Sequence, residues 1–200
     1  MTRPSRFVLF ASSLLLAGWA VTPAATAAAA APAATDRAQA ESQKLNAIFD
    51  EYFEEYLQQN PILATSIGDP RYNDRFVVGI SPTAMAAEEK LHRDYLARLQ
   101  TVDRAVLPTA DQLSYDIFKT GREREIEGFK FPDELIPLNQ FYSTPNSFAQ
   151  LGSGNGMQPF ETVQDYDNFL KRINGFVAWT DQAMINMREG VQKGYTLPRV

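Results

Sequence analysis

One amphipathic stretch constrains the fold of this chain more than any other feature of its sequence. Between Asp36 and Asn60, apolar side chains recur at intervals of three and four residues: Leu45, Ile48, Phe49, Tyr52, Phe53, Tyr56 and Leu57. This is the period of an α-helix with one broad apolar face. Four of these seven residues are large aromatics. We therefore predict that this face is buried against a substantial partner surface.

Local start and stop signals place further helices along the chain. Ser81-Pro82 pairs an N-cap serine with a proline at the first helical position, and Gly68 can end a short helix in a left-handed conformation. The predicted helices cover residues 62–67, 82–102, 109–127, capped by Thr109 or Asp111, and 162–194, with a bend at Gly175 and an end marked by Gly190 and Gly194. Since no strand-rich stretch or internal repeat is evident, the sequence predicts an all-α fold.

The segment from Gly128 to Pro159 differs from the rest. It contains four prolines, five aromatic residues and a glycine-rich run at 152–156. We predict one long loop here, and a loop of this length inside a compact domain is often functional. Its aromatic content indicates that it packs on another part of the protein.

The N-terminus has the pattern of an export signal. Arg3 and Arg6 precede an apolar run from Phe7 to Ala20, which is shorter than the ~20 residues that span a bilayer. Ala25-Thr26-Ala27 fits a cleavage site. The predicted organisation is a signal peptide at 1–27, an alanine-rich spacer at 28–40 and a helical domain at 41–200. The expected product is periplasmic or secreted, without a stable membrane anchor; an uncleaved anchor is the alternative.

Composition excludes several classes of site. The chain has no cysteine, one histidine and a formal charge of −5. Disulfides, thiolate metal sites and a cysteine nucleophile are therefore excluded, and so is any self-contained site that needs two histidines. The acidic balance argues against a nucleic-acid partner. Oligomeric state does not follow from these features.

Two groups of polar residues are candidate ligand sites. Glu88 and His92 share a helix face, but zinc usually needs a third protein ligand, so we interpret them as a surface glutamate beside a partly exposed histidine. The acidic cluster Asp50, Glu51, Glu54 and Glu55 lacks the calcium-loop pattern. A solvated face, or a face paired with arginines, fits that cluster better. The sequence thus predicts no catalytic residue and no metal site in this chain.

Several segments, in this order and spacing, carry a resemblance to a known family. They are Leu45–Pro61 (LNAIFDEYFEEYLQQNP), Ala64–Asp69 (ATSIGD), Asp111–Asp116 (DQLSYD), Ile136–Gln140 (IPLNQ), Asp165–Ile173 (DYDNFLKRI) and Arg188–Arg199 (REGVQKGYTLPR). Together they resemble the N-terminal part of proteins of the domain-of-unknown-function family 885 (DUF885). The resemblance covers residues 41–200.

The resemblance implies an exported, mostly helical zinc metallopeptidase about three times as long as this chain. Its zinc motif, H-E-x-x-H, lies farther toward the C-terminus and is absent here. This chain would then be a truncated, non-catalytic N-terminal segment that shapes the substrate channel. Zinc would be expected only in the other part, with a peptide as substrate. The alternative is an independent helical periplasmic module that binds a peptide or partner without catalysis.

Asn139, Gln140 and Tyr142 are the candidate substrate-binding residues. Amide side chains can bond to a peptide backbone, and a tyrosine ring can cover an apolar side chain. The competing interpretation is that Asn139 and Gln140 satisfy backbone groups of their own loop.

Overall fold

The computed structural model describes residues 27–139, 141 and 143–197, and in this part of the chain it contains helices and no strands. The predicted all-α fold is confirmed. The α-helices are α1 (Ala27–Gln59), α2 (Pro61–Ser66), α3 (Pro82–Leu99), α4 (Thr109–Gly128), α5 (Thr144–Leu151) and α6 (Val163–Lys193). Short 3-10 helices are η1 (Pro70–Tyr72), η2 (Arg104–Val106) and η3 (Asp133–Leu135).

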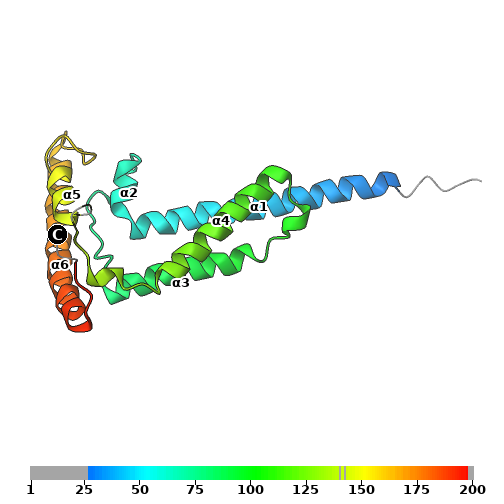
Figure 1. Cartoon of the computed structure of the whole chain (residues 1–200). Helices are drawn as coiled ribbons and strands as arrows, with labels where there is room; N and C mark the ends of the chain where they lie inside the picture. Colours follow the sequence, from blue (N-terminus) through cyan, green and yellow to red (C-terminus); the bar gives the residue numbers. More distant parts are fainter. Residues whose placement is uncertain (1–26, 140, 142, 198–200) are drawn as a thin grey trace, which may run out of the picture.

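Three long helices and one crossing helix define the architecture. Helices α1, α3 and α4 lie alongside one another as an elongated bundle, and α6 crosses one end of it (Figure 1). At that end α1 and α4 finish and α3 begins, while α5 lies along α6 (Figure 1). The segments that connect α1 to α3 and α4 to α6 therefore meet at the end of the bundle that α6 crosses.

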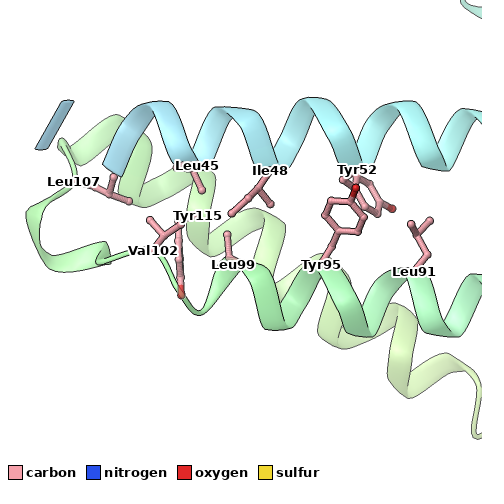
Figure 2. Packing of buried hydrophobic residues seen from close by; sticks show 9 residues of the cluster. All are labelled: Leu45, Ile48, Tyr52, Leu91, Tyr95, Leu99, Val102, Leu107 and Tyr115. Atoms are coloured by element: carbon pink, nitrogen blue, oxygen red, sulfur yellow. The ribbon is translucent and has the colours of Figure 1, made fainter. Parts of the chain in front are cut away.

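The main core lies between the three bundle helices. Figure 2 shows its nine buried residues: Leu45, Ile48 and Tyr52 from α1, Leu91, Tyr95 and Leu99 from α3, Val102 and Leu107 from the following turn, and Tyr115 from α4. A second cluster joins Leu57 at the end of α1 to Ala64 and Tyr72. Most of the stripe predicted on α1 is therefore buried, in two separate clusters.

Phe53 is the exposed member of this stripe. Its side chain is 46 % exposed, whereas Tyr52 and Leu57 on either side are buried. Tyr52 faces α3 and α4, and Leu57 faces α2 and η1. Phe53 belongs to neither cluster, because neither group of partner helices extends over its side of α1.

The predicted N-caps at Ser81 and Thr162 form. The Ser81 hydroxyl accepts a hydrogen bond from the Ala84 backbone N–H at 3.2 Å. Thr162 and Asp165 form a reciprocal capping box at the start of α6. Such bonds satisfy donors that the first helical turn leaves unpaired, which is why these starts are predictable from sequence.

Other predicted boundaries are corrected. Helix α1 already includes Ala27, the first described residue, ahead of the expected Asp36, because alanine is the strongest helix former. Helix α3 ends at Leu99 and not at Val102. Pro108 occupies the N-cap of α4 without a side-chain bond, so neither Thr109 nor Asp111 caps it.

The long loop predicted from Gly128 to Pro159 is not continuous. It contains η3 and the eight-residue helix α5, whose first turn is capped by the Ser143 hydroxyl through the Asn146 N–H at 3.4 Å. Serine and proline around the start of α5 are the same signal that marks α3. The density of prolines and glycines nearby obscured it in the sequence.

Two glycines in α6 allow the crossing helix to approach its neighbours. A Cβ at Gly175 would lie 2.6 Å from the Phe76 carbonyl oxygen, and one at Gly190 would lie 2.8 Å from the Leu135 carbonyl oxygen. Gly190 therefore serves close packing of η3 and does not end the helix. The end is at Gly194, as predicted, with φ of 82°.

The predicted signal peptide lies outside the described residues up to position 26. The alanine-rich stretch expected as a spacer forms the beginning of α1. Within the described ranges, no helix combines the length and the apolar character needed to cross a bilayer.

Candidate functional site

The predicted substrate-binding residues lie between η3 and α5. Asn139 is half-buried, and its side-chain oxygen accepts a hydrogen bond from the Phe141 backbone N–H at 2.8 Å. Gln140 and Tyr142 lie outside the described residues. The contact of Asn139 agrees with the interpretation that it supports its own loop, and a role in substrate binding stays a prediction.

The acidic cluster on α1 is paired with basic and phenolic groups. Glu54 accepts two hydrogen bonds from the Arg71 guanidinium, and Glu51 forms an ion pair with Arg98. The Tyr95 hydroxyl donates to Glu55 at 2.8 Å. These partners explain three of the four carboxylates as groups that link α1 to η1 and α3, which agrees with the interpretation of a face paired with arginines.

A hollow of about 340 Å³ opens where the crossing helix meets the bundle. Four carboxylates line it: Glu88 from α3, Glu125 from α4, and Asp133 and Glu134 from η3. We call it the acidic pocket. Phe129 and Phe131, in the turn after α4, supply aromatic walls, and Ile80 and Met85 add apolar surface.

The position of the acidic pocket depends on α6. The Asn186 side-chain amide of α6 donates to the Ile80 carbonyl at 2.9 Å and so holds the segment before α3. Gly190 admits Leu135 of η3 against the same helix. Hence α6 fixes two walls of the pocket, although it is distant from α3 in the sequence.

In the described structure, the carboxylates of the pocket are not paired with Lys or Arg side chains. Within the described ranges, Glu125, Asp133 and Glu134 form no salt bridge, and the only such contact of Glu88 is with His92 at 3.9 Å. Burial, followed by the neighbouring charge of Glu125, raises the pKa of Glu88. The pocket is therefore an anionic surface that favours the approach of a cation.

His92 lies buried behind the acidic pocket. Its side chain is 1 % exposed, so the predicted partial exposure is wrong. The ring packs between Tyr52 and Tyr56 of α1 and Phe129 of the pocket wall, with centroid separations of 6.2, 6.5 and 6.3 Å. The sequence shows that Glu88 and His92 are four residues apart on one helix. It does not show that side chains from α1 and the end of α4 cover His92.

The imidazole of His92 has unused hydrogen-bonding capacity. In the part of the chain that the structure describes, neither ring nitrogen has a hydrogen-bond partner, and Nε2 lies 3.9 Å from a Glu88 carboxylate oxygen. Burial lowers the pKa of His92 to about 4, and the positive charge of Arg122 acts in the same direction. The ring is therefore neutral near pH 7.

Glu88 and His92 do not form a metal site with other described residues. No group of three or more His, Asp or Glu side chains among residues 27–139, 141 and 143–197 is arranged to hold a metal ion. The residues present here thus do not fit the zinc that the family resemblance implies for the protein as a whole.

Arg172 is a buried residue that the sequence interpretation missed. It is fully buried on α6 and donates to the carbonyl oxygens of Arg75 and Tyr72, each at 3.0 Å, and to side chains of Thr65 and Gln158. Burial lowers its pKa to about 10. These bonds tie α6 to α2 and η1, so Arg172 holds the crossing in place.

The outer side of α6 carries an exposed apolar stripe. Its members are spaced by seven residues and are 41–80 % exposed: Val163, Leu170, Val177, Met184 and Val191. The opposite side of the helix packs inward through residues such as Arg172 and Trp179. We call these five residues the α6 stripe. A stripe that runs along one side of a 31-residue helix is a surface suited to a protein partner.

Comparison with known proteins identifies a family. Residues 61–200 match the family described as bacterial protein of unknown function (DUF885). No curated protein and no solved structure matches the chain. The matched region runs from α2 through α6 and includes the acidic pocket, Arg172 and the α6 stripe. Because the match covers more than half of its length, the chain belongs to the DUF885 family.

Proposed function

We propose that this chain is the non-catalytic N-terminal part of an exported zinc-dependent peptidase. It packs against a catalytic part and forms one side of the substrate channel. The observation that carries the proposal is the α6 stripe, five apolar residues aligned along the outer side of the crossing helix. Membership of the DUF885 family and the family resemblance supply the peptidase expectation.

The α6 stripe is long enough to run along a domain interface. From Val163 to Val191 the helix rises by roughly 42 Å, at ~1.5 Å per residue. The largest apolar patch on a typical monomer is about 300–600 Å², and larger ones mark interaction sites. Burying such a stripe against another helical part of the protein removes it from water.

Other parts of the proposal concern substrate and location. Asn139, Gln140 and Tyr142 face the peptide, with zinc held by residues outside this chain. The protein is exported to the periplasm or secreted after cleavage near Ala27. These assignments rest on the residue types, the N-terminal pattern and the family resemblance.

The first test is to read the gene past the codon for Val200. A downstream H-E-x-x-H in the same frame is expected. A stop codon at that point would contradict the proposal and favour the independent binding module, for which the acidic pocket is the candidate binding site.

The second test concerns the α6 stripe. In the longer protein, Val177→Asp should weaken packing and lower peptidase activity, because it places a charge in an apolar interface. Ala178→Asp is the matched control: it adds the same charge to the adjacent exposed position, outside the stripe. Equal effects of the two variants on activity and on thermal stability would argue against the α6 stripe as an interface.

A further inference from the structure

We propose that the acidic pocket binds an organic cation, a protonated amine or a guanidinium carried on an apolar body. The inference goes beyond the proposed peptidase segment and does not depend on it. It rests on the convergence of four carboxylates, two aromatic walls and a buried histidine without hydrogen-bond partners.

The carboxylates supply the charge recognition. Glu88, Glu125, Asp133 and Glu134 come from three separate elements and meet around one hollow. Like charges brought together repel unless a counter-charge lies between them. Lys193, a cation influenced by the charge of Glu134, forms its ion pair with Glu189 on its own helix. A ligand with several N–H donors can satisfy carboxylates on different walls.

The geometry favours an organic cation over a metal ion. Among the described residues, these carboxylates are not arranged to hold a metal ion. The volume of the acidic pocket, about 340 Å³, lies in the range of pockets that bind small organic ligands. Phe129 and Phe131 can cover a cation through their ring faces, and Met85 and Ile80 can contact an alkyl chain.

His92 provides an independent indication of a ligand. A polar side chain that is 99 % buried normally has a hydrogen-bond partner, yet both of its ring nitrogens lack one in the described structure. Nε2 lies 3.9 Å from a carboxylate oxygen of Glu88 on the pocket wall, which is beyond hydrogen-bond range. A small shift of Glu88 around a bound cation would pair the two groups, so His92 acts as a positioning residue for Glu88.

The test measures binding of matched cationic and neutral probes by isothermal titration calorimetry. n-Butylammonium and n-butylguanidinium are the cations, and 1-butanol is the neutral control of similar shape. We expect the cations to bind with dissociation constants below about 10 mM and 1-butanol to bind at least about tenfold more weakly. Equal binding of cation and alcohol, or no binding of the cations, would overturn the proposal.

Variants test whether the cations bind in the acidic pocket. Glu125→Gln combined with Asp133→Asn should weaken cation binding by about tenfold or more, because two of the four charges are removed. Glu123→Gln is the matched control, since Glu123 lies on the same helix but pairs with Lys119 outside the pocket. If the control weakens binding as much as the double variant, the interaction is with the overall charge of the protein and the proposal fails. Circular dichroism establishes that each variant is folded.

A comparison of two peptides distinguishes two sources of such a cation: a side chain of a polypeptide and a free small molecule. The tripeptide acetyl-Ala-Lys-Ala-amide is compared with acetyl-Ala-Gln-Ala-amide. Preference for the lysine peptide identifies a side chain of a polypeptide as the ligand. Binding of the free amines alone identifies a small molecule. Both results require the same acidic pocket and the same sensitivity to Glu125→Gln with Asp133→Asn.

Discussion

Buried His92 should make this protein lose stability in mild acid. Its pKa in the folded protein is about 4, below the ordinary value of 6.5, because burial disfavours the imidazolium. In the unfolded chain the same ring is exposed and takes up a proton near pH 6.5. Between these values the unfolded state binds more protons than the native state, so stability falls as pH decreases from 6.5 towards 4.

The magnitude follows from the two pKa values. At pH 5 an unfolded histidine is almost fully protonated and the native ring is almost fully neutral, which stabilises the unfolded state by about 2 kcal/mol. At pH 7 the corresponding effect is about 0.2 kcal/mol. Glu88 acts in the opposite direction, because its pKa is raised and its uptake of a proton favours the native state as pH falls.

Comparison with His92→Met isolates the histidine. Methionine has a similar volume, fits among the rings of Tyr52 and Tyr56, and carries no proton, while Glu88 is retained. Urea unfolding followed by circular dichroism at pH 7 and pH 5 should show an extra loss of about 2 kcal/mol in the parent protein alone. Since the chain has one histidine, its NMR titration can be followed without overlap. An identical pH dependence in parent and variant, or a native pKa near 6.5, would refute the reasoning.

Further predictions concern the packing that holds the pocket in place. Arg172→Met should destabilise the fold by about 3 kcal/mol in urea unfolding, because several buried acceptors lose their donor; a loss below about 1 kcal/mol would contradict its role in the crossing. Leu99→Ala in the main core should cost about 2–5 kcal/mol by the same measurement, against less than about 0.5 kcal/mol for exposed Leu113→Ala, and equal losses would place the core elsewhere. Ser81→Ala should cost about 1 kcal/mol in thermal unfolding, and an unchanged melting temperature would mean that its hydroxyl does not cap α3.

Local signals account for what was predictable. The helical period of α1, the serine and threonine caps of α3 and α6 and the left-handed Gly194 each depend on neighbours a few residues apart. Such features act in any environment, so the all-α class followed from them. Where the local signal was weak, as at Pro108 and around α5, the predicted boundaries were wrong.

The acidic pocket could not be predicted in the same way. The helical spacing of Glu88 and His92 is visible in the sequence, but Glu125 and the two acids of η3 come from later segments that share no pattern with them. They meet because α6 crosses the end of the bundle, and the crossing depends on Arg172, Asn186 and close packing at Gly190. Each of these contacts joins residues that are distant in sequence.

The sequence by itself therefore determined the helices and their apolar faces, while the tertiary structure decided which faces are covered. Phe53 and His92 illustrate the difference: the aromatic residue in an apolar stripe is half-exposed, and the polar residue is buried. The physical reason is that periodicity depends on one helix alone, whereas burial depends on which other elements lie against it.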